Sequence, residues 1–298
     1  MPIPHRQHSA APRDQAHGLR QLFVGSAARF VPLVHNPLVP GAGVVMERLC
    51  AAFAEQGLRT LVVDAADSAS PPNELATVDL PACIEPLSSH VSYLAARGLA
   101  AHYLDGRACL SGFLDAVRGA ARHSDVVLLH AGALDLRRMF AGTTPRPLLL
   151  AGPRADSLTH AYASMKLLSQ RLGVLSYDLV IAGDVASQRA RRMTDRLTEC
   201  ADHFLGAALR HTAVLDPQAS PHSSVPVALL RLTAAHMIVA NRAPAALAAA
   251  ATPRNGTRTS TIPITAPIST AIAAPRQPRP TPAQPAAPRP SVAHSRMN

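Results

Sequence analysis

Six short, continuous apolar runs are spread along the first 215 residues of the 298-residue chain, and they restrict it to few architectures. Each run is apolar at consecutive positions rather than at alternate ones, which is typical of parallel strands covered on both faces. Pro32, inside the first run, has no N–H to donate to a neighbouring strand. The predicted strands are Phe30–Val34, Thr60–Asp64, Asp125–His130, Pro147–Ala151, Asp178–Ala182 and a weak last one, Ala213–Leu215.

The segments between these runs have the apolar spacing of amphipathic helices. Alternating strands and helices imply right-handed crossovers, so the expected fold is an α/β domain with a mostly parallel sheet and helices on both faces. In such domains ligands bind at the carboxyl ends of the strands. The predicted helices are Val44–Glu55, Ser111–Arg122, Ser157–Leu172 and Arg189–Phe204.

Composition divides the chain into three parts. We expect a flexible N-terminus at 1–24, one α/β domain at 25–242 and a disordered tail rich in alanine, proline and arginine at 243–298. The tail holds six arginines and no acidic residue, so it supplies most of the formal net charge of +10. Such a tail can contact anionic lipid or nucleic acid, although a solvated tail is the simpler interpretation. Residues Val225–Val239 predict an apolar helix that packs on the domain, with membrane contact as the alternative.

Several classes of protein are disfavoured by what the sequence lacks. No apolar run reaches 18 residues and the N-terminus has no apolar core of a signal peptide, so we expect a cytoplasmic protein. The four cysteines form no C-x-x-C pair, and the histidines form no H-E-x-x-H motif, so we expect neither a disulfide framework nor a metal site. A G-x-S-x-G elbow is also absent, which disfavours a serine hydrolase.

The turn between the first predicted strand and the first predicted helix, residues 35–43, is where a phosphate-binding loop belongs. Such a loop needs glycines whose backbone N–H groups surround the phosphates, a lysine, and a Ser or Thr hydroxyl for Mg²⁺. This turn offers Gly41 and Gly43, but it has no lysine and no hydroxyl. Pro37 and Pro40 each remove an N–H donor.

The run from Glu47 to Ala65 resembles the first helix and second strand of the MinD/ParA ATPases, whose loop reads G-K-G-G-V-G-K-T. The resemblance places the last loop glycine at Gly41, the phosphate-binding lysine at Ala42, the Mg²⁺ threonine at Gly43 and the signature lysine at Pro37, next to Asn36. Asp64 matches the aspartate of the family's second strand. Residues 125–133 resemble its switch strand, with His130 where the family has an acid. The resemblance thus implies a P-loop NTPase-like fold with a degenerate nucleotide site, where ATP and Mg²⁺ bind only if the altered loop still holds them.

Three further segments resemble FlhG, the family of MinD-like regulators of flagellar number. Residues 153–168 resemble P-x-x-x-S-x-T-D-A-Y-A-x-I-K-x-L, with His160 in place of the aspartate, and residues 203–206 resemble R-F-L-G. Residues 14–20, Asp-Gln-Ala-His-Gly-Leu-Arg, fit the D-Q-A-x-x-L-R motif with which the family engages the flagellar GTPase FlhF. The resemblance covers about residues 14–240 and implies an FlhF-type GTPase as the partner.

The N-terminal motif has a physical rationale. Asp14 is a good helix N-cap, while Ala16 and Leu19 would face a groove on the partner. Arg20 could pair with acids or phosphate, and Gln15 could orient the attacking water beside bound GTP. A capped surface helix without a partner is the alternative interpretation of the same residues.

The sequence therefore favours a regulator of flagellar biosynthesis that works through protein–protein contacts and stimulates an FlhF-type GTPase. Flagellar basal-body components, and a weak contact with the membrane surface or the cell pole, are further expected partners, whereas nucleic acid is disfavoured. Two alternatives stay open. One is an active MinD/ParA-type ATPase with a non-standard loop, and the other is a polar scaffold or a relative of DNA-partitioning proteins.

Overall fold

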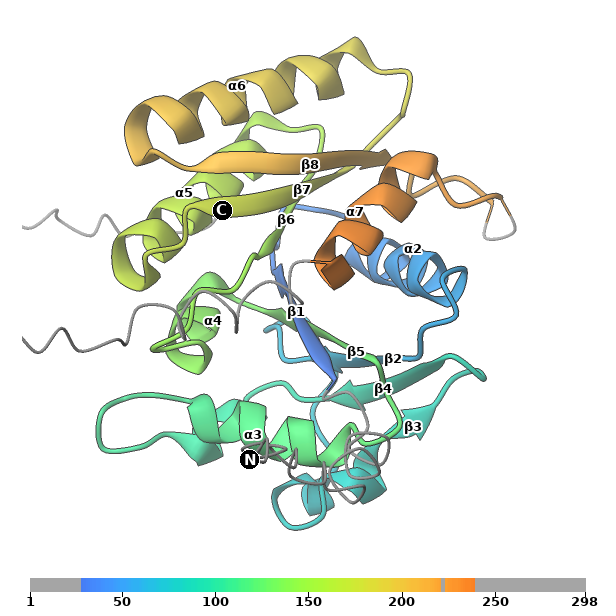
Figure 1. Cartoon of the computed structure of the whole chain (residues 1–298), viewed down its shortest axis with the longest axis vertical. Coiled ribbons are helices and arrows are strands. Elements are labelled where there is room, and N and C mark those ends of the chain that lie inside the picture. The colour runs from blue at the N-terminus through green and yellow to red at the C-terminus, as the bar shows by residue number, and fades with distance from the viewer. Residues whose placement is uncertain (1–27, 221–222, 239–298) are drawn as a thin grey trace, which may run out of the picture. The chain divides into compact units, whose positions relative to one another are not determined.

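The computed structural model describes residues 28–220 and 223–238, which contain one eight-stranded sheet with the strand order β3-β4-β2-β5-β1-β6-β7-β8 (Figure 1). The predicted segments 14–20 and 243–298 lie outside these residues. All strands pair in parallel except β3, which runs antiparallel to β4. The strands are β1 (Arg29–Val34), β2 (Thr60–Asp64), β3 (Glu85–Pro86), β4 (Val91–Ala95), β5 (Val126–Ala131), β6 (Leu148–Ala151), β7 (Ser176–Ala182) and β8 (Ala208–Leu215).

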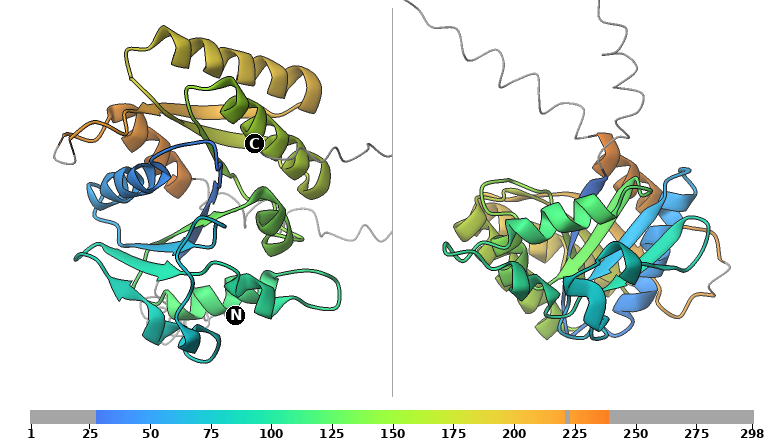
Figure 2. Two further views of the ribbon diagram at one scale, coloured as in Figure 1. Left: turned by 180° about the vertical axis from the view of Figure 1, so that it is seen from behind. Right: turned by 90° about the horizontal axis from the view of Figure 1, so that it is seen from below.

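Helices cover both faces of this sheet, as the views from opposite sides show (Figure 2). The α-helices are α2 (Ala42–Ala54), α3 (Ser111–Ala120), α4 (Ala133–Met139), α5 (Ala155–Leu172), α6 (Gln188–Leu205) and α7 (Val227–Ile238). Short 3₁₀ turns lie at Glu74–Thr77, Pro81–Cys83 and Leu99–Tyr103. None of the helices in the described ranges is both long and apolar enough to span a membrane.

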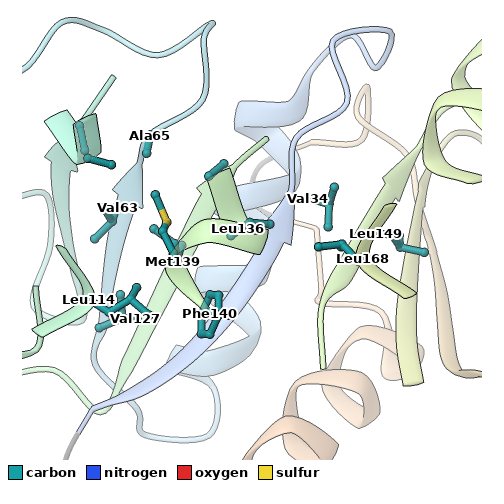
Figure 3. Packing of buried hydrophobic residues seen from close by; sticks show 14 of the residues in the cluster. Val34, Val63, Ala65, Leu114, Val127, Leu136, Met139, Phe140, Leu149 and Leu168 are labelled. Atoms are coloured by element: carbon teal, nitrogen blue, oxygen red, sulfur yellow. The ribbon is translucent and has the colours of Figure 1, made fainter. Parts of the chain in front are cut away.

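Successive strand residues point to opposite faces, and they divide the buried apolar side chains into two clusters. Val62 packs with α2 and α7 on one face, whereas its neighbour Val63 packs on the other face. Leu136, Met139 and Phe140, from α4 and the residue after it, belong to that second cluster (Figure 3). The expected α/β architecture, a mostly parallel sheet between two layers of helices, is therefore confirmed.

Pro32 lies in the centre of the sheet, where a missing N–H would be expected to weaken the ladder. Arg29 and His35 donate their N–H groups to Asp125 and Ala131 on the β5 side, at 2.9 and 2.8 Å, so the odd-numbered residues of β1 face β5. The N–H position of Pro32 consequently faces β6, which pairs with β1 only at Leu33 and Val34. The proline thus occupies a place where the neighbouring strand does not reach.

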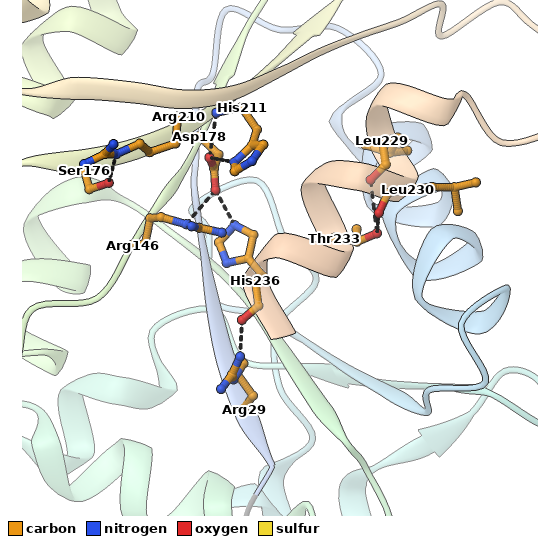
Figure 4. A network of polar contacts seen from close by, with 10 residues as sticks. All are labelled: Arg29, Arg146, Ser176, Asp178, Arg210, His211, Leu229, Leu230, Thr233 and His236. Carbon is orange, nitrogen blue, oxygen red and sulfur yellow. Dashed lines mark hydrogen bonds and ion pairs between the residues drawn. The ribbon is translucent and has the colours of Figure 1, made fainter. Parts of the chain in front are cut away.

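The last described helix, α7, packs on α2 and β8 and is also fixed to the sheet by a buried acid (Figure 4). Asp178 of β7 is fully buried, and its carboxylate lies 2.8 Å from Arg146 Nε, 3.0 Å from His211 Nδ1 and 2.8 Å from His236 Nε2. His236 lies in the last turn of α7, and its carbonyl accepts a hydrogen bond from Arg29. Polar contacts at the amino ends of the strands therefore hold the end of α7.

Candidate functional site

The turn between β1 and α2 keeps the geometry of a strand–loop–helix unit. Gly41 caps α2 with a φ of 77°, a left-handed conformation that favours glycine. A Cβ added to Gly41 would lie 3.2 Å from Cβ of Pro217, in the connection after β8, so the space beside this glycine is filled. Ala42 and Gly43 follow as the first residues of the helix, and the helix begins without a side-chain cap.

Asn36 fixes this turn to the neighbouring elements. Its side chain is almost fully buried, and Nδ2 donates to the carbonyl of Leu150 at 2.8 Å and to Oγ and the carbonyl of Ser157 at 3.1 and 3.0 Å. Oδ1 accepts the N–H of Leu38 at 3.2 Å, and Ser157 Oγ in turn accepts the N–H of Gly152 at 2.8 Å. The amide is thus occupied by internal bonds, while Pro37 next to it is exposed.

A second set of internal bonds joins the ends of three adjacent strands. Asp64 ends β2 and lies opposite His130 of β5, and Oδ1 of the acid is 2.8 Å from Nδ1 of the imidazole. Nε2 of His130 lies 3.1 Å from Nδ1 of His35, the residue after β1. The two rings meet edge to face with centroids 4.9 Å apart. Parallel pairing brings the strand ends to one edge of the sheet, and this produces the buried chain Asp64–His130–His35.

Burial also affects the pKa of His35, the last residue of the buried chain Asp64–His130–His35. Burial first, and then the nearby His130, lower the pKa of His35 below its ordinary 6.5, while Asp64 and Asp67 oppose the shift. His35 is therefore neutral at physiological pH, and its ring bonds as one donor and one acceptor.

The described residues at this turn do not fit a magnesium nucleotide. Asp64 Oδ1 already contacts His130 Nδ1 and the N–H of Ala66, at 2.8 and 3.3 Å, so the matching acid of the family is held by protein atoms. The positions for lysine and threonine carry Pro37, Ala42 and Gly43. Within 28–220 and 223–238, no three His, Cys, Asp or Glu side chains group closely enough to hold a metal ion.

The structure places the predicted loop residues around one edge of the sheet. Asn36, Asp64 and His130 lie at the carboxyl ends of the strands, and Gly41 begins the adjacent helix. His35 contacts His130 and Ser157 contacts Asn36, but neither residue was predicted from the sequence as part of the site. A signal was present for His35, since it directly follows a predicted strand at the edge where His130 ends another. The described residues do not include those of the predicted N-terminal partner motif, Asp14, Gln15, Ala16, Leu19 and Arg20.

No protein-family model matches the chain, and no curated protein sequence matches it. Among solved structures, cobyrinic acid a,c-diamide synthase from Mycobacterium smegmatis with bound ADP and magnesium aligns with a TM-score of 0.51 at 16% identity, over 72% of this chain and 96% of the synthase chain. A second structure of that synthase aligns with a TM-score of 0.50 at 16% identity, over 70% of this chain and 94% of its own. MinD cell division protein from Aquifex aeolicus aligns with a TM-score of 0.49 at 12% identity, over 70% of this chain and 97% of its own. The synthase alignments establish a shared P-loop NTPase-like fold and nothing beyond the fold.

Proposed function

We propose that this chain regulates flagellar biosynthesis and number through protein–protein contacts, and that it stimulates an FlhF-type GTPase through Asp14–Arg20. The observation that carries the proposal is the state of the nucleotide site. The fold and the turn geometry are kept, but Asn36 is bonded internally and Asp64 is bonded to His130. A domain with these features is better suited to present a surface than to hydrolyse ATP.

Energetics support a domain that works without its own nucleotide. A phosphate buried without a cationic partner carries a penalty of about several kcal/mol, and the turn has no lysine or arginine to offset it. The uncapped N-terminus of α2 contributes only the helix dipole, which is worth about 0.3–1 kcal/mol to an anion. The penalty of burying the phosphate exceeds the contribution of the helix dipole, so we expect the site not to retain a nucleotide.

The finer part of the proposal concerns how the GTPase is stimulated. Gln15 would orient the attacking water, while Ala16 and Leu19 would dock on the GTPase and Arg20 would bind an acid or a phosphate. The resemblance of residues 153–168 to the same family supports this assignment. Basal-body components and a weak contact with the membrane surface or the cell pole belong to the same proposal as further partners.

GTP turnover by a purified FlhF-type GTPase tests this proposal. We expect the full chain to accelerate hydrolysis and the Gln15→Ala variant to lose about tenfold or more of that acceleration, because the attacking water is no longer oriented. Gln21→Ala is the matched control, since it removes an amide just beyond the motif and should leave the acceleration unchanged. Equal acceleration by the wild type and Gln15→Ala would refute the mechanism.

A further inference from the structure

A hollow of about 660 Å³ opens beside the degenerate turn, and we call it the α4–α5 hollow. It lies against α4 and α5, which cover the face of the sheet opposite α2 and α7 (Figure 1). The polar side chains that line it are His35, Asp67, Ser68, Asp135, His160 and Ser164. Leu134 and Leu167 form an apolar part of its wall.

The buried chain of acid and imidazoles ends in this hollow. A carboxylate only accepts hydrogen bonds, so Nδ1 of His130 carries the proton that faces Asp64. Nε2 of His130 lies 3.1 Å from Nδ1 of His35, so one of these two nitrogens donates to the other. When Nδ1 of His35 is the donor, a neutral His35 keeps a lone pair on Nε2, and Nε2 has no hydrogen-bond partner in the described part of the chain. His35 is only 8% exposed, and it lines the hollow.

Two carboxylates share the hollow with that acceptor. Burial first, and the nearby Asp67, raise the pKa of Asp135, while Arg138 opposes the shift. Arg138 Nη1 lies 3.8 Å from Asp135 Oδ1, too far for a close hydrogen bond. No lysine or arginine lines the hollow among the described residues, although the chain as a whole carries a net charge of +10. The hollow is therefore rich in acceptors and negative in a basic protein.

The geometry points to the α4–α5 hollow as a binding site for an alkylguanidinium or alkylammonium group. The cationic head would donate to His35 Nε2 and to the carboxylates of Asp67 and Asp135, and the alkyl stem would lie along Leu134 and Leu167. This inference goes beyond the proposed function and does not depend on it, because binding is measured without any GTPase.

Calorimetric titration of the full chain with butylguanidinium tests the inference, with butyl phosphate as the anionic probe of equal stem length. We expect saturable binding of the guanidinium and none of the phosphate. His35→Phe keeps a planar ring but removes the lone pair, and Asp135→Asn removes a charge, so each should weaken binding about tenfold. Asp202→Asn removes an exposed acid on α6 that does not line the hollow, and should leave the affinity unchanged.

A histidine long-range ¹H–¹⁵N spectrum supplies a readout that does not depend on the variants. We expect Nε2 of His35 to be unprotonated in the free protein and to shift when butylguanidinium is added. Two further probes separate the sources of the cation. Agmatine stands for a free small molecule and N-acetylarginine amide for a protein side chain, and the tighter binder assigns the source.

Three results would overturn the inference: no saturable binding of any cation, equal affinity in the wild type and Asp135→Asn, or tighter binding of butyl phosphate than of butylguanidinium. If His35→Phe fails to fold by circular dichroism, Asp67→Asn takes its place as the second variant, since Asp67 is exposed. An unchanged affinity in both acid variants then refutes the site.

Discussion

Two buried aspartates lie near opposite ends of the strands, and they have similar partners but different surroundings. Asp178, near the amino ends of the strands, is enclosed by Arg146, His211 and His236 (Figure 4). Asp64, at the carboxyl ends, contacts His130, and the chain continues to His35 at a hollow. Both sites join a carboxylate to histidines, but the second ends at a residue that lines a hollow.

The difference separates a structural cluster from a candidate binding site. The partners of Asp178 come from the segment just before β6, from β8 and from α7, so they link the end of the last described helix to the sheet. An enclosed acid beside a buried arginine supports the fold, because removing the acid leaves that charge buried without its partner. An acid whose chain of hydrogen bonds ends at a hollow is instead a candidate part of a binding site.

The largest expected effect is on stability, and it tests the structural half of the comparison. Asp178→Ala leaves Arg146 without its acid in a buried place, so we expect a loss of about 3–5 kcal/mol of unfolding free energy. Asp64→Ala removes the hydrogen-bond acceptor of His130 Nδ1 and of the N–H of Ala66, and should cost about 1–3 kcal/mol. Urea unfolding curves measure both, and an equal or larger loss for Asp64→Ala would contradict the comparison.

A smaller effect is expected at the turn beside Asp64. Gly41→Ala places a Cβ 3.2 Å from Pro217 at a φ of 77°, so we expect a loss of about 1–2 kcal/mol. Gly43→Ala is the matched control, because nothing lies within 4 Å and alanine favours the helix by about 1 kcal/mol. Thermal unfolding compares the two variants, and an equal loss in both would show that the turn does not have this geometry.

The smallest expected effect is on the pH dependence of the free energy of unfolding. Burial lowers the pKa of His236 below 6.5, although Asp178 opposes the shift, so the unfolded chain takes up this proton at a higher pH than the folded one. Stability contributed by neutral His236 is therefore present above about pH 7 and decreases as the pH falls through 6.5. Burial also lowers the pKa of His35, at the carboxyl ends of the strands, so His35 adds to the same pH dependence of stability.

Urea midpoints between pH 8 and pH 5 measure this slope, and His236→Gln should make it shallower. The Asp178 carboxyl does not obscure the result. Burial raises its pKa, but His236, Arg146 and His211 together bring the pKa below its usual 3.8, so it stays charged throughout this range. An unchanged slope in His236→Gln would show that this histidine does not titrate differently on unfolding.

The sequence predicted the buried strands better than the edge of the sheet. Thr60–Asp64 coincides with β2, whereas β4 was not predicted because Ser92 interrupts its apolar residues and its side chains are only partly buried. The weak prediction at Ala213–Leu215 is the end of a longer strand, β8, whose first half is partly exposed. Helix α4 has seven residues and follows β5 after Gly132 alone, too short for its period to be recognised.

The candidate site was predictable in position but not in its bonding. The resemblance assigned Asn36, Asp64 and His130 to the degenerate nucleotide site, and it identified the missing lysines. The partners of these side chains depend on strand register, since 66 residues separate Asp64 from His130 and 95 separate His130 from His35. No local pattern encodes such contacts, and the bonds of Ser157 to the turn are likewise a product of the fold.

Thermal unfolding with and without MgATP tests the central claim, that the nucleotide site no longer works. A nucleotide present at about 100 times its dissociation constant would stabilise the chain by about 2.7 kcal/mol, and a domain of this size gains about 2–4 °C per kcal/mol. We expect no measurable change in Tm at millimolar MgATP. A rise of about 5–10 °C would contradict it and would favour an active ATPase with an unusual loop.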